Sequence, residues 1–339
     1  MTGLLHNLRT DVRVYPHQLD LLNDTVLLVQ LSESELLEHS FLDQRVLQQG
    51  MNYEWTAWGQ FAAVAGAIPP KVPTYIFHIG HCGSTLLSRL ISAATATRAL
   101  REPLPLRSIA FDHADGPAAL LSADDRRARL GIFERIWARG APQTVVKATS
   151  MCTNVMELVD PDAAMVFVYQ QLEVHLAVVL AGENKLQDLR GFAQNRYRRL
   201  KAFDVDMAPL AELSAGELAA LSWLAEVVSA SRTLTQRSVV KLDFDHFLNQ
   251  PQDSLVEVCE QLGMNAPADA CSAAVNGPIM RTYSKAPEHE YGPGLRRDII
   301  ADSRRRNETA IREAVTWIQR LAATSAVVSA AIEAVSQPR

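Results

Sequence analysis

Residues 74–89 read Thr74-Tyr-Ile-Phe-His-Ile-Gly80-His81-Cys82-Gly83-Ser84-Thr85-Leu-Leu-Ser88-Arg89. The first part, residues 75–79, is apolar, aromatic and β-branched, which is typical of a short buried strand. Two glycines follow, and leucine and isoleucine then recur at helical spacing. The order of strand, glycine turn and helix predicts an anion site, because the first amides of a helix lack partners within the helix and the helix dipole adds positive charge there.

The glycines and hydroxyl residues of this stretch suit a loop that binds an anion. Gly80 and Gly83 allow the backbone to bend and to approach a ligand closely. Ser84 and Thr85 can donate hydroxyl hydrogen bonds to phosphate or sulfate oxygens. The nucleotide-hydrolase loop, Gly-x-x-x-x-Gly-Lys-Ser/Thr, does not fit, because Ser84 stands where its lysine would be. The pattern therefore favours a single phosphate or a phosphosulfate, and the alternative is a glycine turn without a ligand.

The run from His78 to Leu87 resembles the 5′-phosphosulfate-binding loop of the sulfotransferase family, which usually reads Pro-Arg/Lys-Ser-Gly-Thr-Thr. Together with later motifs, the resemblance covers roughly residues 72–295. It implies a donor, 3′-phosphoadenosine 5′-phosphosulfate, whose phosphosulfate is held by Gly80, Cys82, Gly83, Ser84 and Thr85. His81 would stand at the family's Arg/Lys position, and a bound anion would raise its pKa and favour its charged form.

Two further strand ends carry residues that the resemblance assigns to catalysis. One probable strand ends at Arg101-Glu102-Pro103, and residues 144–150 form another that carries Lys147. Ligands gather at the carboxyl edge of an open parallel sheet, and a buried lysine is costly unless it reaches water or an anion. The resemblance implies that Glu102 is the general base and that Lys147 contacts the sulfuryl group. A surface Arg–Glu pair is the alternative for Glu102.

The chain departs from the family where the family binds the donor's 3′-phosphate. Gln170 stands at the position of the family's arginine, and Val178 at that of its serine. Without a guanidinium, the site loses its strongest charge-assisted hydrogen bonds to that phosphate. Either the donor lacks a 3′-phosphate, or other basic residues supply the charge. The candidates are Arg281 and Lys285 of a late loop, and Lys185, Arg190, Arg196 and Arg198 of a basic cluster.

Composition indicates a globular protein without a general affinity for polyanions. The chain has 339 residues, of which 48% are hydrophobic and 21% charged, with a net charge of −5. These values give no reason to expect nucleic-acid or membrane binding. We expect a cytoplasmic protein without a metal site, because no signal peptide or zinc-ligand spacing is evident and the cysteines are scattered. The four cysteines are Cys82, Cys152, Cys259 and Cys271.

The predicted fold is an α/β three-layer sandwich with a parallel sheet of about five strands and P-loop-like topology. Residues 1–71 are expected to form a helical N-terminal segment, and residues 72–339 the sulfotransferase-like domain. A capping box at Ser32 predicts a helix over about 33–48, and Trp55, Trp58 and Phe61 predict a second one. One amphipathic helix is expected over 308–335. Arg296 and Arg297 are expected on a solvated helix face, with contact to the donor as the alternative.

The function that these residues favour is transfer of a sulfuryl group from a phosphosulfate nucleotide to a hydroxyl-bearing acceptor, either a small molecule or a glycan. Two alternatives stay open. A nucleotide-dependent phosphotransferase could use the same sheet and loop, and a non-catalytic anion-binding or nucleotide-binding protein could have kept the pocket alone. The sequence does not identify the acceptor, and it leaves open whether the protein forms a homo-oligomer.

Overall fold

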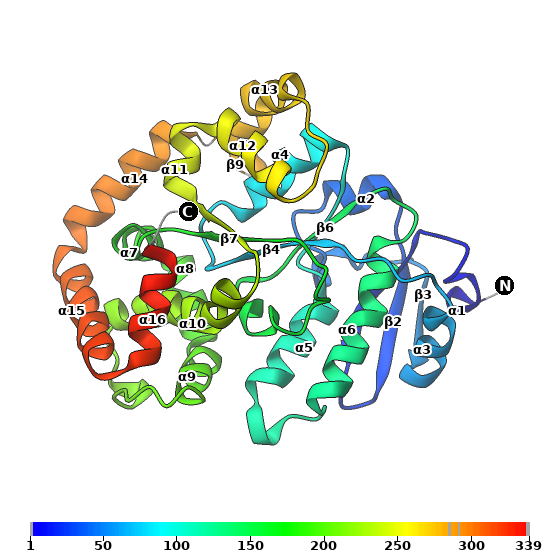
Figure 1. The fold of residues 1–339 in the computed structure, drawn as a ribbon, viewed down its shortest axis with the longest axis horizontal. Helices are drawn as coiled ribbons and strands as arrows, with labels where there is room; N and C mark the ends of the chain where they lie inside the picture. The colour runs from blue at the N-terminus through cyan, green and yellow to red at the C-terminus, as the bar shows by residue number, and fades with distance from the viewer. Residues whose placement is uncertain (1–2, 284–285, 291, 337–339) are drawn as a thin grey trace.

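A five-stranded parallel sheet lies at the centre of the computed structural model, which describes residues 3–283, 286–290 and 292–336 (Figure 1). Its strands are β4 (Thr74–His78), β5 (Arg98–Arg101), β6 (Thr144–Lys147), β7 (Met165–Tyr169) and β8 (Val240–Asp243), in the spatial order β5-β6-β4-β7-β8. The first of these strands in the chain is therefore central, so the loop after β4 lies at the middle of the carboxyl edge. This arrangement confirms the predicted α/β sandwich with P-loop-like topology.

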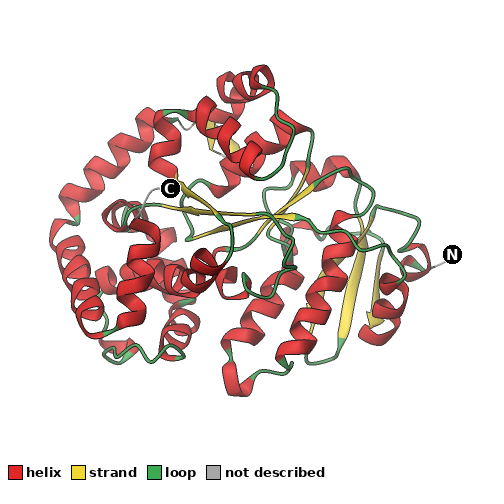
Figure 2. Cartoon of the chain, in the orientation of Figure 1, coloured by secondary structure: helices red, strands yellow, loops and turns green. Residues whose placement is uncertain are grey.

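Helices cover both faces of the sheet (Figures 1 and 2). One face carries α4 (Ser84–Thr95), α12 (Pro251–Gln261) and α13 (Ala268–Asn276), and the other carries α5 (Leu104–Ala114), α6 (Ala123–Ala138) and α10 (Ala215–Gln236). The remaining helices are α1 (Leu4–Asn7), α2 (Glu33–Glu38), α3 (Trp58–Gly66), α7 (Leu172–Val179), α8 (Glu183–Gly191), α9 (Ala193–Lys201), α11 (Phe244–Asn249), α14 (Pro293–Arg306), α15 (Glu308–Thr324) and α16 (Ala326–Ser336).

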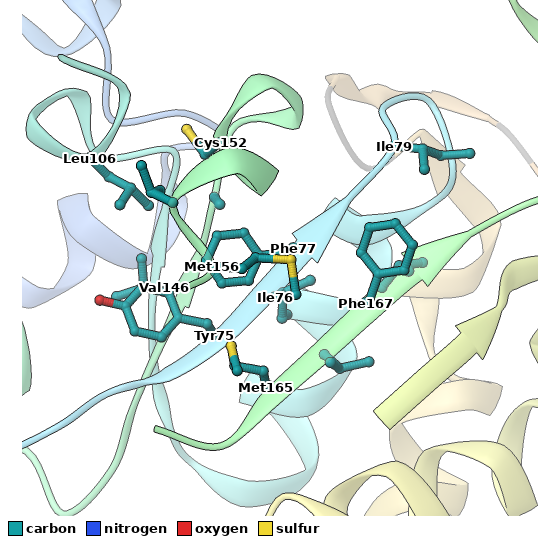
Figure 3. Close-up of a cluster of buried hydrophobic side chains, with 14 of the residues drawn as sticks. Tyr75, Ile76, Phe77, Ile79, Leu106, Val146, Cys152, Met156, Met165 and Phe167 are labelled. Carbon is teal, nitrogen blue, oxygen red and sulfur yellow. The ribbon is translucent and has the colours of Figure 1, made fainter. Parts of the chain in front are cut away.

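The core beneath the sheet is built from the strand residues that the sequence marks as apolar. Tyr75 and Phe77 of β4 project to the same face, with ring centroids 5.4 Å apart, and pack with Val146 and Met156 (Figure 3). All four side chains are fully buried. Burial of such side chains stabilises the fold by about 1.5–3 kcal/mol each. The sheet edge that carries the loop therefore rests on a closely packed platform.

The N-terminal segment contains the predicted helices and, in addition, an antiparallel sheet that was not predicted. This sheet consists of β1 (Val14–Asp20), β2 (Thr25–Gln30) and β3 (Tyr53–Ala57). The prediction of Trp55 on a helix is wrong, because Trp55 lies in β3 and pairs with Leu27 of β2. The capping box at Ser32 is present, but α2 ends at Glu38 rather than near residue 48. Division of the chain after residue 71 stays a prediction.

The C-terminal part forms two helices instead of the single one expected. Helices α15 and α16 meet at Ser325 and are bent by 117° relative to each other. Their joint length and apolar composition would suffice to cross a membrane, whereas no single helix in the described part of the chain meets that requirement. A further two-stranded sheet pairs β9 (Thr282–Tyr283) with β10 (Ala286–Glu290).

His17 provides a test of this fold through the pH dependence of its stability. The residue lies at a bulge in β1, is fully buried, and neither ring nitrogen has a hydrogen-bond partner among the residues that the structure describes. Burial lowers the pKa of His17 from 6.5 to about 4, with Asp43 acting in the opposite direction. The unfolded chain therefore binds this proton more readily. Stability from this residue is full above pH 6.5 and declines as the pH falls toward 4.

We expect His17 to account for a loss of about 2 kcal/mol in the free energy of unfolding between pH 7 and pH 5. In His17→Leu, the loss of unfolding free energy between these two pH values, measured by urea denaturation, should be smaller by about 2 kcal/mol, because no proton is taken up at this site. The exposed His6 supplies the control, and His6→Gln should keep the wild-type pH dependence. An unchanged loss in His17→Leu would contradict the burial of a neutral imidazole.

Candidate active site

The loop between β4 and α4 adopts the tight turn that its glycines predict. Gly80, His81 and Gly83 have positive φ angles of 87°, 53° and 78°. His78, the last residue of β4, holds the loop in place. Its Nδ1 accepts a hydrogen bond from the Gly80 amide at 3.0 Å, so Nε2 carries the proton and donates to the Ala148 carbonyl oxygen at 2.8 Å. The histidine thereby ties the loop to the residue that follows β6.

The N-terminus of α4 has an incomplete set of hydrogen bonds. Gly83 is its N-cap residue, and no side chain in the described part of the protein caps the helix. Thr85 is 3% exposed, and its Oγ1 has no hydrogen-bond partner among the described residues. A buried hydroxyl without a partner costs about 1–3 kcal/mol unless water or a ligand supplies one. The helix amides and this hydroxyl together point to an anion at this position.

The loop forms one wall of a pocket of about 120 Å³. His81, Gly83, Ser84 and Thr85 line this pocket from the loop side. Across from them lie apolar side chains together with two cationic ones. These lining residues include Val178, Lys185, Phe244, Leu248, Met280, Pro293 and Arg296. A small pocket with helix amides, basic side chains and an apolar wall suits an anionic group attached to a less polar moiety.

Phe244 packs directly on the loop glycine. A Cβ atom built on Gly83 would overlap the Phe244 ring, so no larger residue fits at position 83. Phe244 is the first residue of α11, where Asp243 caps the helix by accepting from Asp245 N at 2.9 Å. The ring therefore forms part of the apolar wall beside the anion position.

Arg296 lines this pocket, although the sequence favoured a solvated helix face over contact with the donor. The expectation that it lies on a solvated helix face is wrong, because it is 7% exposed and lines the pocket. Its Nη1 forms an ion pair with Asp245, and its guanidinium carbon lies 5.4 Å from the centroid of the Phe244 ring. Its Nη2 is buried and has no hydrogen-bond partner in the described part of the chain. An anion in the pocket would supply that partner.

The basic residues over 185–201 lie in three different surroundings. Lys185 lines the pocket, and its Nζ donates to the Val178 carbonyl at 2.7 Å. Arg199 instead pairs with the buried Glu226 at 2.8 Å, which is a contact within the core. Arg198 is exposed and pairs with Asp115. Lys185 is thus the member of the cluster that reaches the pocket wall beside the loop.

Glu102 and Lys147 lie together at the adjacent strand ends. The Glu102 amide donates to the Lys147 carbonyl at 2.7 Å, and the Lys147 ammonium forms an ion pair with the Glu102 carboxylate. Lys147 is fully buried, and its Nζ lies 5.8 Å from the centroid of the Phe41 ring. Glu102 has a φ of 59°, a conformation uncommon outside glycine that is found preferentially at functional sites. Neither residue is among those that line the pocket.

The other residues that the resemblance assigned to the donor differ in their surroundings. Gln170 is fully buried, and neither atom of its side-chain amide has a hydrogen-bond partner within the described residues. Cys82 lines the pocket, although its thiol donates to the Val168 carbonyl at 3.3 Å. Arg281 is exposed and donates to the Asn276 carbonyl. Lys285 lies outside the described residues.

Comparisons with known proteins give one distant structural likeness. No protein-family model and no curated protein match this sequence. Among solved structures, the chain is similar to the crystal structure of a sulfotransferase from Mycobacterium avium, with a TM-score of 0.40 and 10% sequence identity. The alignment covers 72% of this chain and 79% of that one.

Proposed function

We propose that this protein transfers a sulfuryl group from a phosphosulfate nucleotide to a hydroxyl-bearing acceptor. One observation carries the proposal. Thr85 and Arg296 line one pocket at the N-terminus of α4, and among the described residues neither the Thr85 Oγ1 nor the Arg296 Nη2 has a hydrogen-bond partner. These groups come from segments more than 200 residues apart (296 − 85 = 211) and offer hydrogen bonds that an oxyanion would accept.

In this proposal the amides of Gly83, Ser84 and Thr85 hold the phosphosulfate end of the donor. The acceptor oxygen attacks the sulfur atom, and the bond between sulfur and the bridging oxygen breaks, so the nucleotide phosphate leaves with the bonding electrons. Glu102 takes the acceptor proton. Lys147 and His81 stabilise the charge that develops on the bridging and sulfuryl oxygens. Lys147 must turn from Glu102 toward the donor for this step, since the two form an ion pair in the present structure.

The charge for the distal end of the donor is assigned to Arg296 and Lys185. Gln170 offers no charge where the related family has an arginine. Arg296 and Lys185 both line the pocket, and either can make charge-assisted hydrogen bonds to a second anionic group. A phosphotransferase remains the second candidate function, because the neutral Gln170 is equally compatible with a nucleotide that lacks a 3′-phosphate.

Calorimetric titration separates the candidate functions. The protein should bind adenosine 3′,5′-bisphosphate more tightly than ATP with magnesium or inorganic sulfate. A preference for ATP with magnesium would instead favour the phosphotransferase. If none of the three ligands binds, neither the sulfotransferase nor the phosphotransferase function is supported.

Thr85→Val tests the role of the unpartnered hydroxyl in binding. Valine has nearly the same shape, so we expect the fold to persist and the affinity for adenosine 3′,5′-bisphosphate to fall about 10- to 100-fold, through loss of a hydrogen bond to a charged group. Thr95→Val, near the end of the same helix, is the matched control and should leave the affinity unchanged. Equal affinities of Thr85→Val and wild type would remove this hydroxyl from the site.

A further inference from the structure

The backbone conformation of His81 indicates that its side chain has a specific role. Its φ of 53° lies in the left-handed region, which a glycine would adopt with less strain. The flanking residues Gly80 and Gly83 also have positive φ and are glycines, as this conformation favours. His81 lines the pocket, and 22% of its side chain is exposed. A histidine at this position is therefore consistent with a function of its ring in the pocket.

Charged groups from two helices, α8 and α9, lie near the His81 ring. Its Nε2 lies 3.7 Å from the Asp188 Oδ2 of α8, and the same oxygen lies 3.5 Å from the Arg196 Nη2 of α9. Lys185, also on α8, lines the same pocket. His175 of α7 is buried, and its pKa is well below the ordinary value because of burial first and then the positive charges of His81, Arg196 and Lys185. Arg196 and Lys185 thus lie in the same neighbourhood as His81, and like charges disfavour protonation of an imidazole.

Asp188 opposes these cations. Burial alone would raise the pKa of this carboxyl, but its contacts with His81 and Arg196 outweigh burial and lower the pKa below its usual value. The group is therefore an anion at neutral pH. An opposite charge within about 4–6 Å favours the charged form of a titratable group. Asp188 is in position to do this for the imidazole of His81.

We propose that Asp188 is a positioning residue that keeps His81 protonated at neutral pH and directed toward the anion pocket. Histidine can then replace the permanently charged arginine or lysine that an anion-binding loop would otherwise need. The inference rests on the proposed function only in that the pocket binds an anion; the protonation of His81 can be measured without any ligand.

NMR titration of the histidine side chains tests this directly, with the His81 signal assigned by its loss in His81→Gln. We expect the pKa of His81 in the wild type to lie above 7, as a ring that is mostly protonated at neutral pH requires, and to fall by about one unit in Asp188→Asn. We expect a pKa shift at the low end of the range that a neighbouring opposite charge usually causes, because the side chains of His81 and Asp188 are both partly exposed. Glu183→Gln removes an exposed carboxylate from the same helix and should leave the titration unchanged.

A second readout separates this role from a purely structural one. Calorimetry with adenosine 3′,5′-bisphosphate should show that Asp188→Asn weakens binding several-fold at pH 7.5 and hardly at all at pH 5.5, where the imidazole is protonated in either variant. Asp188→Glu, which keeps the charge, should restore most of the affinity at pH 7.5.

The outcomes differ for this inference and for the proposed function. An equal loss of affinity at both pH values, or an unchanged pKa of His81 in Asp188→Asn, would overturn the role of Asp188. If Asp188→Asn does not fold, a wild-type pKa of His81 at or below 7 would overturn it as well, because the ring would then be mostly neutral at pH 7. A raised pKa that depends on Asp188, without binding of the bisphosphate at either pH, would uphold the inference and contradict the proposed function.

Discussion

Gly83→Ala should lower the free energy of unfolding by about 3–5 kcal/mol, the largest loss of stability that we expect from a single added methyl group in this chain. Two causes add together. Gly83 has a φ of 78°, a conformation that costs alanine about 1–2 kcal/mol. The new methyl group would also overlap the ring of Phe244, which is buried and cannot move without displacing its neighbours. Urea denaturation followed by circular dichroism measures the loss.

Gly131→Ala is the matched control for this prediction. Gly131 lies inside α6 with nothing within 4 Å of an added Cβ, so alanine there should stabilise the protein by about 0.5–1 kcal/mol. The double variant Gly83→Ala, Phe244→Leu should lose less free energy of unfolding than the two single variants lose together, because the smaller side chain at position 244 leaves room for the methyl group. A Gly83→Ala protein within 1 kcal/mol of the wild type would contradict the contact between this ring and the loop.

Lys147→Ala and Glu102→Gln should each slow sulfuryl transfer about 100-fold or more. Lys147 is the last residue of β6, the strand next to β4, and its ammonium forms an ion pair with the Glu102 carboxylate. Removal of the ammonium takes away stabilisation of the leaving oxygen, and the amide of glutamine cannot accept the acceptor proton. Steady-state rates with a phosphosulfate donor give both effects once an acceptor is in hand.

Lys241→Ala controls for a general effect of removing a strand lysine. Lys241 lies in β8 of the same sheet, and its Nζ donates to the Ala334 carbonyl at 3.0 Å, away from the loop. Its replacement should leave the rate within about two-fold of the wild type. Near-normal rates in both Lys147→Ala and Glu102→Gln would remove the pair from the mechanism.

The features that sequence reasoning predicted correctly are local ones. The strand, turn and helix over residues 74–95 follow from periodicity and from two glycines within one continuous stretch. The capping box at Ser32 likewise depends on residues three positions apart. Such signals determine where an element begins, and five strands with the loop after the first of them were sufficient to predict the fold.

The features that were missed depend on contacts between distant parts of the chain. The N-terminal sheet forms because Trp55 pairs with Leu27 across 28 residues, and the helical spacing of its aromatic residues gives no sign of this pairing (55 − 27 = 28). Arg296 has the sequence context of a solvated helix, yet packing of α14 on α7 and an ion pair with Asp245, 51 residues earlier, bury it beside the loop. No property of a single sequence reports such a juxtaposition.

The central claim is that the first amides of α4 and the Thr85 hydroxyl hold an anion. A crystal structure of the complex with adenosine 3′,5′-bisphosphate tests it most directly. We predict that the 5′-phosphate oxygens lie within about 3.2 Å of the Ser84 and Thr85 amide nitrogens and of the Thr85 Oγ1, with the Arg296 guanidinium bonded to the same ligand. A bound nucleotide whose phosphates lie away from this helix terminus, with Thr85 still unpartnered, would contradict the account.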